Sequence, residues 1–583
     1  MSDARLEQAR QHYEAGRFEQ ARAALQRVIQ QSPGNAAAAN GMALVLARLG
    51  HHEQAVFFAR RAVAARPDDP GMLVTLGNTL GMMGKAQESA DALGRALALD
   101  PARDDARIGL ATALRQLDLY PEAAAILRDL VSRHPADSAA AALLSATLWS
   151  MARVEESVDV ARAALATSPH DPELASMLAN ALNYDPRATP EETVAAHRQF
   201  GVLLAAANPT PSAPPVWKGT NDPDRPLRLG LISHDLRRHS CAYFLEPLFR
   251  HIDRGEISIV CYSTSEKEDD MTTRLKSLVP VWRSSAALTD AALAERIIAD
   301  GIDVLVETGG LTQGHRLGVM LRRPAPVQVT FLGYPNTTGV PAIGYRIVDS
   351  HTDPAGAEAW ALEGLIRLDP CFLCFSPPEG SPSPASELVP LTFGSFNAAT
   401  KINGPLIALW ARVLDAVPGS KVVLKAFNFR DAALRDEMTR RFADGGIGAD
   451  RLEILPPAAG ISEHLAQYAR VGVALDTFPY HGTTTTLEAL HMGVPVVALA
   501  GRSHAGRVGV SLLEGVGLGD LIARDEDDYV RIAAGVARDE ARRVALRASL
   551  RGRLLASPLC DGPGYAARFS AAIREMWRQR CAT

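Results

Sequence analysis

The sequence predicts an α-helical solenoid followed by a two-lobed α/β region in which each lobe holds a doubly wound parallel sheet. Three observations lead to this fold class. Prolines recur every 34 residues between residues 33 and 169, a proline-rich stretch follows at residues 208–215, and short apolar runs alternate with helical segments from residue 227 onward. A fixed helical period is typical of a solenoid, and strand–helix alternation is typical of a parallel sheet.

The solenoid prediction depends on residues that keep the same place in successive repeats. The prolines are Pro33, Pro67, Pro101, Pro135 and Pro169. Small residues keep a second place: Ala21, Ala55, Ser89, Ala123 and Ser157. A 34-residue period is that of the two-helix tetratricopeptide unit, in which proline ends the second helix and small residues let the paired helices approach closely. We expect five stacked units with a partial sixth, over residues 170–183, as a cap.

The turn between the two helices of a repeat is marked by glycine. Gly16, Gly50 and Gly84 stand there in the first three repeats, and glycine readily takes the left-handed conformation that ends a helix. An open superhelix presents a concave groove, so we expect residues 1–183 to bind a protein or peptide. The alternative is a scaffold that only packs against its neighbouring domain.

A helical connector and proline-rich linker over residues 184–226 separate the solenoid from the α/β region. Predicted strands of the first lobe, residues 227–385, are 227–233, 257–262, 302–307 and 327–333. Those of the second lobe, residues 386–583, are 392–396, 421–425, 452–455, 471–476 and 494–499. Two such lobes form a cleft between the carboxyl ends of their strands. GT-B type nucleotide-sugar glycosyltransferases share this plan, as do some epimerases and phosphorylases.

Composition excludes several classes of protein. The net charge is -5 with both signs interspersed, so no nucleic-acid partner is expected. An apolar run near 18 residues and an apolar signal core are both missing, so we expect no membrane span. Six cysteines in a chain this long do not make a disulfide framework, so we expect a reducing cytoplasm. Cys371 and Cys374 are the one close cysteine pair. A zinc site would need a second pair, so we predict no metal and interpret this segment as a buried strand.

The clearest candidate site is the segment from Asp476 to Glu488. A strand ends near Asp476, Gly482 permits a sharp turn, and four threonines then begin a helix: Thr483, Thr484, Thr485 and Thr486. Backbone N–H groups and hydroxyls at a helix N-terminus bind anions, and a diphosphate fits such a site. Glu488 is then expected to face a ribose hydroxyl. The alternative is a capping box between Thr485 and Glu488.

Three further motifs follow predicted strands and therefore face the cleft. Lys401, preceded by Asn397, follows the first strand of the second lobe, where a cation would neutralise a leaving diphosphate. His239 follows the first strand of the first lobe. The Gly/Asn/Thr loop of residues 333–339 contains Pro335 and Thr338. Each is individually weak, because a lone lysine or histidine is usually solvated and such a loop is often a structural turn.

Together these motifs resemble the protein O-GlcNAc transferase family, and most closely its SPINDLY-type branch. The resemblance lies in residues 333–339, 371–374, 392–397, 476–486 and 557–563, in this order behind tetratricopeptide repeats. It implies an inverting, metal-independent transfer of a sugar from a nucleotide sugar to Ser or Thr hydroxyls of a protein. By the same resemblance Lys401 matches a diphosphate-binding lysine, His239 a histidine at the sugar and acceptor end of the cleft, and His464 a nucleotide-contacting histidine.

Three positions depart from the animal-type pattern of this family. Thr483 replaces a histidine, Ile461 replaces a lysine three residues before His464, and Ala398 replaces a glutamine. The co-substrate is therefore expected to be UDP-GlcNAc or GDP-fucose, with no other cofactor. Alternatives are a flagellin-type glycosyltransferase that uses another nucleotide sugar and a catalytically inactive repeat scaffold. A small-molecule epimerase would not explain the solenoid, and the sequence leaves a homo-oligomer open.

Overall fold

A computed structural model describes residues 2–210, 215, 217, 219–385 and 391–582 of the chain. The chain divides into two compact units, Met1–Pro169 and His170–Thr583. Part of the predicted linker, residues 211–214, lies outside the described residues, and so does the start of the predicted second lobe at residue 386.

The first unit consists of paired antiparallel helices, which confirms the predicted solenoid. Its helices are α1 (Ser2–Glu14), α2 (Phe18–Gln31), α3 (Ala36–Arg48), α4 (His52–Ala65), α5 (Pro70–Met82), α6 (Ala86–Leu99), α7 (Asp104–Gln116), α8 (Tyr120–Arg133), α9 (Ser138–Ser150) and α10 (Val154–Thr167). The second helix of each pair ends at residue 31, 65, 99, 133 or 167, so the ends recur every 34 residues. A proline follows each of these helix ends at the second position.

Helix packing explains why small residues recur at the same place in each repeat of the solenoid. The small residues at the shared place are all buried: Ala21, Ala55, Ser89, Ala123 and Ser157. The three turn glycines have φ between +71° and +79°, and the fourth and fifth repeats place Asp118 (φ 59°) and Ala152 (φ 56°) at the equivalent turn. The repeat geometry therefore imposes the left-handed conformation even where glycine is missing.

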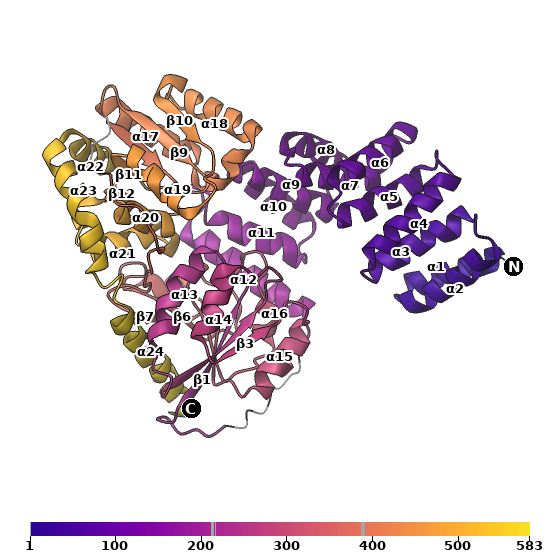
Figure 1. Cartoon of the computed structure of the whole chain (residues 1–583), viewed down its shortest axis with the longest axis horizontal. Helices are drawn as coiled ribbons and strands as arrows, with labels where there is room; N and C mark the ends of the chain where they lie inside the picture. The colour runs from indigo at the N-terminus through magenta and orange to yellow at the C-terminus, as the bar shows by residue number, and fades with distance from the viewer. Residues whose placement is uncertain (1, 211–214, 216, 218, 386–390, 583) are drawn as a thin grey trace. The chain divides into compact units, whose positions relative to one another are not determined.

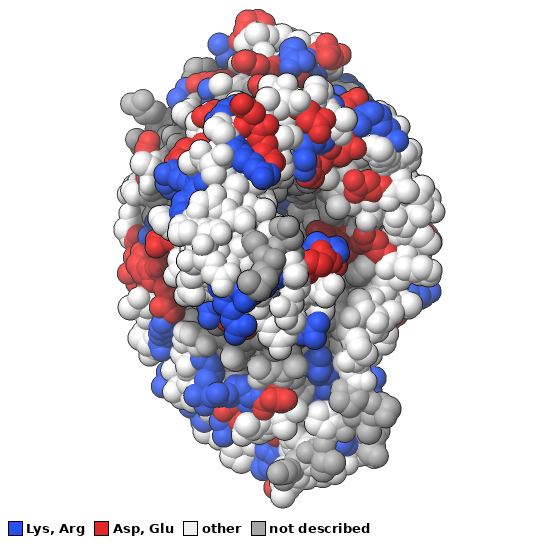
Figure 2. Space-filling view, turned by 90° about the vertical axis from the view of Figure 1, so that its right-hand side faces the viewer, with Lys and Arg blue, Asp and Glu red and all other residues white. Residues whose placement is uncertain are grey.

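Charged side chains on the repeats are periodic as well. Arg60 pairs with Glu88 at 2.5 Å, and Arg128 pairs with Glu156 at 2.9 Å, which is the same contact two repeats later. These pairs are solvent-exposed, so each contributes little to stability. On the face of the molecule in Figure 2, Lys and Arg are interspersed with Asp and Glu.

The second unit begins with two helices that sequence reasoning assigned to the cap and the connector. These are α11 (Pro172–Leu182) and α12 (Pro190–Ala207). They cluster with the α/β region rather than with the repeats. The cause is close packing on the first lobe, where Gly201 of α12 lies directly against Gly339.

The first lobe contains a parallel sheet of strand order β3-β2-β1-β4-β5-β6-β7 (Figure 1). Its strands are β1 (Leu227–Ser233), β2 (Ile257–Ser263), β3 (Val281–Ser284), β4 (Val304–Glu307), β5 (Val327–Thr330), β6 (Tyr345–Val348) and β7 (Gly364–Arg367). Its helices are α13 (Ser240–His251), α14 (Asp270–Leu278), α15 (Asp290–Ala299) and α16 (Leu317–Leu321). The sequence did not predict β3, β6 or β7. β3 and β7 form the sheet edges, where partly exposed residues give no apolar run, and β6 lies between β5 and β7.

The second lobe contains a parallel sheet of strand order β10-β9-β8-β11-β12-β13. Its strands are β8 (Thr392–Ser395), β9 (Lys421–Lys425), β10 (Leu452–Leu455), β11 (Val473–Leu475), β12 (Val496–Leu499) and β13 (Ile522–Ala523). Its helices are α17 (Gly404–Ala416), α18 (Ala432–Asp444), α19 (Ile461–Ala466), α20 (Thr484–His491), α21 (Val508–Gly515), α22 (Glu526–Arg538) and α23 (Glu540–Leu555). Two doubly wound parallel sheets confirm the predicted α/β fold class.

The last helix, α24 (Gly562–Ala582), returns to the first lobe and packs beside α13 (Figure 1). Trp577 is fully buried there and donates its indole N–H to the carbonyl of Asp222 at 3.0 Å. The helix therefore ties the chain end to the first lobe. No helix among the described residues is both long enough and apolar enough to cross a membrane.

The segment around Cys371 and Cys374 is buried, but its predicted strand is wrong. Its backbone bonds go to three separate partners instead of a neighbouring strand. The N–H of Phe372 reaches the Asp349 carboxylate, the Phe372 carbonyl accepts from Tyr565, and the N–H of Phe375 reaches the Leu559 carbonyl. Such dispersed bonding satisfies buried backbone groups without forming a ladder.

Candidate functional site

The two sheets direct their topological switch points toward one cavity. β1 lies between β2 and β4, and β8 lies between β9 and β11, so the winding direction reverses at β1 and at β8. Doubly wound sheets bind ligands beyond the carboxyl ends of strands at such points. A cavity of about 400 Å³ is bounded by the loops that follow both strands. Its walls include Tyr184, His239, Cys241, Thr312, Leu332, Gly333, Pro335, Phe372, Asn397, Ala398, Lys401, Tyr480, Thr483, Thr484, Thr485 and His504.

The threonine segment forms the wall contributed by α20. The N-cap residue of α20 is Thr483, so Thr485 lies inside the helix and the capping box between Thr485 and Glu488 is wrong. Thr485 instead donates its hydroxyl to the Asn397 side-chain oxygen at 3.0 Å. The buried Thr484 hydroxyl has no hydrogen-bond partner among the described residues. A helix N-terminus with uncommitted groups facing a cavity suits an anion.

Asp476 and Gly482 fix the conformation of the threonine turn. One Asp476 oxygen accepts from the N–H of Gly482 at 2.7 Å and of Thr477 at 2.9 Å, and its side chain is buried. A Cβ on Gly482 would lie 2.4 Å from the Thr485 hydroxyl and 2.9 Å from the Asn397 side-chain oxygen. Glycine is therefore needed for close approach, and Asp476 acts by holding the turn rather than by facing the main cavity.

Lys401 ends a short 3₁₀ turn, η2 (Ala399–Lys401), on the opposite side of the threonine turn. Its ammonium donates to the His481 carbonyl at 2.6 Å and lies 4.0 Å from the centre of the Tyr480 ring. Burial lowers the pKa of Lys401 to about 8, while Asp476 acts in the opposite direction. Because water solvates this buried ammonium poorly, an anionic ligand would stabilise its charge strongly.

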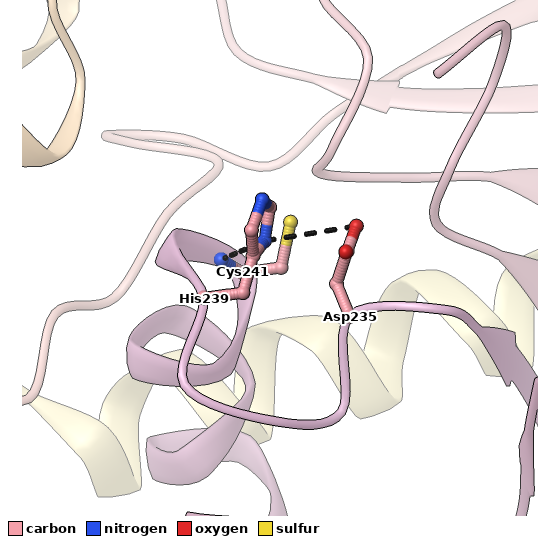
Figure 3. A group of neighbouring side chains, drawn as sticks. All are labelled: Asp235, His239 and Cys241. Atoms are coloured by element: carbon pink, nitrogen blue, oxygen red, sulfur yellow. Dashed lines mark hydrogen bonds and ion pairs between the residues drawn. The ribbon is translucent and has the colours of Figure 1, made fainter. Parts of the chain in front are cut away.

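His239 is the N-cap residue of α13, at the first-lobe end of the cavity (Figure 3). Its Nδ1 lies 3.3 Å from the N–H of Cys241 and 3.6 Å from an Asp235 oxygen. Burial lowers the pKa of His239, and the Asp235 carboxylate partly opposes this. Both contacts use Nδ1, so Nε2 is the ring nitrogen available to a ligand. The structure thus brings the predicted His239 and Lys401 to one cavity.

Asp235, His239 and Cys241 are also a set of side chains that could hold a metal. Their ligand atoms lie within 4.8 Å of one another, and a carboxylate, imidazole and thiolate set suits Zn²⁺ (Figure 3). Burial raises the pKa of the Cys241 thiol far above its usual range. The thiol is therefore protonated rather than poised to bind a metal. Metal independence stays a prediction.

His464 and Glu488 lie on the far side of the threonine turn and contact each other directly. His464 Nε2 is 2.9 Å from a Glu488 oxygen, which also accepts from the Tyr468 hydroxyl at 3.3 Å. Glu488 is buried and already bonded, so it positions His464. The predicted contact between Glu488 and a ribose stays a prediction.

The loop after β5 divides between the cavity and the protein interior. Leu332, Gly333 and Pro335 line the cavity. Leu332 has φ 82°, and the N–H of Gly333 donates to the Phe331 carbonyl at 3.1 Å, which is the pattern of a strained γ-turn. Thr338 is fully buried and donates to Glu363 at 2.5 Å, so its hydroxyl serves the loop rather than the cavity.

Tyr184 and His504 are among the cavity residues that sequence reasoning missed. Tyr184, just after α11, stacks on Tyr480 with ring centres 4.4 Å apart, below the Lys401 ammonium. His504 Nδ1 lies 2.5 Å from a buried Asp353 oxygen, and this contact joins the second lobe to the first. Neither had a usable signal, because Tyr184 lies in a segment that resembles a repeat and His504 has no motif around it.

Two of the three positions that depart from the animal-type pattern lie in the cavity wall. Thr483 and Ala398 line the cavity directly. His481, two residues before Thr483, is fully buried with its ring nitrogens on the Leu499 carbonyl at 2.8 Å and the Gly509 N–H at 3.0 Å. His481 therefore does not replace the missing histidine in the cavity.

Comparison with known proteins agrees with the fold and the site. The model of glycosyl transferase family 41 matches residues 214–373 and 387–569, together more than half of the 583 residues. A tetratricopeptide-repeat model matches residues 12–73 and 82–147. A solved structure of a Thermobaculum terrenum O-GlcNAc transferase mutant is 32% identical with a TM-score of 0.65, covering 100% of this chain and 98% of that one.

Curated relatives point the same way. The Arabidopsis thaliana protein called probable UDP-N-acetylglucosamine–peptide N-acetylglucosaminyltransferase SPINDLY is 40% identical over 409 residues, which cover 69% of this chain and 44% of that protein. Its Oryza sativa namesake is 41% identical over the same shares. The chain thus spans less than half the length of these relatives. With its repeats, its paired parallel sheets and the site between them, this chain belongs to glycosyl transferase family 41, as a member similar to the SPINDLY-type proteins.

Proposed function

We propose that this chain is a protein O-glycosyltransferase that moves a sugar from a nucleotide sugar to Ser or Thr hydroxyls of proteins selected by its repeats. The observation that carries the proposal is one cavity holding Lys401, His239 and the open N-terminus of α20 at the switch points of both sheets. An anion site, an ammonium and an imidazole are the groups that such a transfer requires.

The proposed reaction is one inverting displacement without a metal. The acceptor oxygen bonds to the anomeric carbon while the bond from that carbon to the phosphate oxygen breaks. Lys401 and the α20 N-terminus stabilise the nucleoside diphosphate that leaves. His239 is the candidate to receive the hydroxyl proton, because its lowered pKa keeps the imidazole neutral near pH 7.

The donor is proposed to be UDP-GlcNAc or GDP-fucose, and one experiment separates them. Ser- and Thr-containing acceptor proteins would be incubated with the full chain and a panel of nucleotide sugars, followed by intact-mass measurement. The mass added to the acceptor names the sugar, and a third mass would indicate another donor, as in a flagellin-type enzyme.

A non-catalytic scaffold is the competing function, because Ala398 and Ile461 replace polar residues of the animal-type pattern. Calorimetric titration with UDP, GDP and their sugars distinguishes the two. Nucleotide binding at micromolar affinity together with acceptor modification supports the enzyme. If no nucleotide binds and no acceptor gains mass, the scaffold is the correct function.

Donor binding is predicted to weaken above pH 8. Lys401 has a pKa of about 8, so it is charged below that pH and neutral above it. A bound diphosphate favours the charged form, so the complex has the higher pKa and Kd rises by up to about tenfold per pH unit above 8. Calorimetry between pH 7 and 9.5 measures this rise. In Lys401→Met the rise beginning near pH 8 should vanish, and an equal rise in that variant would contradict the assignment.

Deleting residues 1–135 is predicted to impair protein glycosylation more than donor binding. The residues lining the large cavity all lie beyond residue 169, in the second compact unit. We expect kcat/KM for a protein acceptor to fall by at least about tenfold, equivalent to ~1.4 kcal/mol of acceptor binding, with donor Kd unchanged. Equal loss of donor binding would mean that the repeats mainly support the fold.

We further propose that the protein works in a reducing compartment, the cytoplasm. All six cysteines are free, and four of them are buried. Reduced cysteines are usual in cytosolic proteins.

A further inference from the structure

A second pocket lies beside the threonine turn, at the carboxyl end of β9 and the start of α19. It has a volume of about 340 Å³ and mainly apolar walls. Phe396 and His464 contribute rings to it, and Phe427, with 68% of its surface exposed, stands at its edge. Lys425 is the lysine in its wall.

Lys425 is a charged residue in a buried position inside a sheet, which is unusual. It is the last residue of β9, which lies inside the sheet between β8 and β10, and only 4% of its surface is exposed. Its ammonium lies 5.4 Å from the centre of the Phe396 ring. Within the described parts of the chain, no carboxylate lies within ion-pair distance of it. Burial lowers the pKa of Lys425 and outweighs the opposing effect of the Glu488 and Glu463 carboxylates, so an anionic ligand would stabilise its charge further.

The direct partner of Lys425 is the His464 ring. Its ammonium contacts His464 Nδ1, and His464 Nε2 lies 2.9 Å from Glu488. With Lys425 as the donor, Nδ1 accepts, and Nε2–H donates to the Glu488 carboxylate. An ammonium has three N–H donors, so Lys425 has donors left for acceptors in the pocket.

The pocket also contains the position at which the sequence departs from the animal-type pattern. Ile461 lines it from α19, where that pattern has a lysine. The apolar Ile461 and the charged Lys425 thus face the same space from different elements. Compared with the animal-type pattern, α19 lacks a lysine at position 461, while β9 carries one at position 425.

We propose that Lys425 binds the nucleoside end of the donor, at the α-phosphate and ribose oxygens, and takes over the function of the lysine missing at position 461. This inference rests on the proposed function. The donor carries two negative charges, and the two buried lysines then lie on either side of the threonine turn, Lys401 toward the sugar and Lys425 toward the nucleoside. Ile461 is consequently no sign of an inactive protein.

The test is calorimetric titration of UDP and GDP into full-length variants. Lys425→Ala should weaken binding of the preferred nucleotide by about tenfold to a hundredfold, as expected for a lost charge-assisted bond. Lys421→Ala, at the exposed start of the same strand, is the matched control and should bind like the unmodified chain. Lys425→Met, which keeps the apolar stem, replaces Lys425→Ala if the smaller residue lowers the melting temperature.

Rescue distinguishes a direct contact from a structural effect. Adding Ile461→Lys to Lys425→Ala should recover about tenfold of the lost affinity, because it returns a cation to the pocket without restoring the strand residue. Unchanged binding in Lys425→Ala and Lys425→Met, while Lys401→Ala binds weakly, would overturn the inference. Weak binding without any rescue would also overturn it, in favour of a role in packing. If the unmodified chain binds neither nucleotide, the proposed function fails first.

Discussion

Replacing Lys401 by alanine or methionine should reduce sugar transfer by about 10²- to 10³-fold while the protein stays folded. The ammonium is held by the His481 carbonyl and the Tyr480 ring beside the α20 N-terminus. Among the described residues that line the large cavity, Lys401 is the one lysine or arginine. Removing one preorganised charge from a site where diphosphate charge develops lowers the rate by about two to three powers of ten.

Replacing Lys401 should lower activity, but it should leave the stability of the fold unchanged or raise it. The folded-state pKa of Lys401, about 8, lies below the ordinary value of 10.5, so folding opposes protonation of this amine. At pH 7 the buried charge therefore costs stability, and this cost disappears as pH rises from 8 past 10.5. We expect the melting temperature of Lys401→Met at pH 7 to equal or exceed that of the unmodified chain. Full transferase activity in a folded Lys401→Ala protein would show that the site is wrongly assigned.

Gly201→Ala should lower the free energy of unfolding by about 3 kcal/mol or more. A Cβ at Gly201 would lie 1.7 Å from the Gly339 carbonyl oxygen and 2.5 Å from its carbon. These are backbone atoms, which cannot move aside as a flexible side chain would. Gly339 cannot yield either, because its φ is +75° and its own Cβ position is 1.9 Å from the His197 carbonyl.

This contact also affects the site, because the Gly339 loop carries Pro335 and the segment before α12 carries Tyr184. Urea unfolding followed by circular dichroism measures the loss of stability. Gly535→Ala is the matched control, since a Cβ there meets nothing within 4 Å in α22. The control should gain about 0.5–1 kcal/mol, as expected for glycine to alanine inside a helix. Equal unfolding midpoints for Gly201→Ala and the unmodified chain would contradict the packing described here.

The sequence by itself determined the features that are local or periodic. The proline and small-residue register predicted the solenoid, because each repeat buries the same face. The apolar runs predicted the central strands, because a strand covered on both faces must be apolar throughout. His239 and Lys401 were predicted for a related reason. Each follows the first strand of a doubly wound lobe, and the carboxyl end of that strand is the switch point of its sheet.

Only the tertiary structure decided which side chains meet across the chain. Tyr184 reaches Tyr480 from a helix pair that resembles a repeat, Thr338 turns to Glu363, and the segment around Cys371 distributes its backbone bonds among separate partners. Lys425 reaches the pocket of Ile461 from another element. Such pairings depend on contacts between residues far apart in sequence, and no local period or propensity encodes them. The solenoid could therefore be predicted almost completely from its repeat, whereas the composition of the cavity depended on how the two lobes and the α11–α12 pair pack.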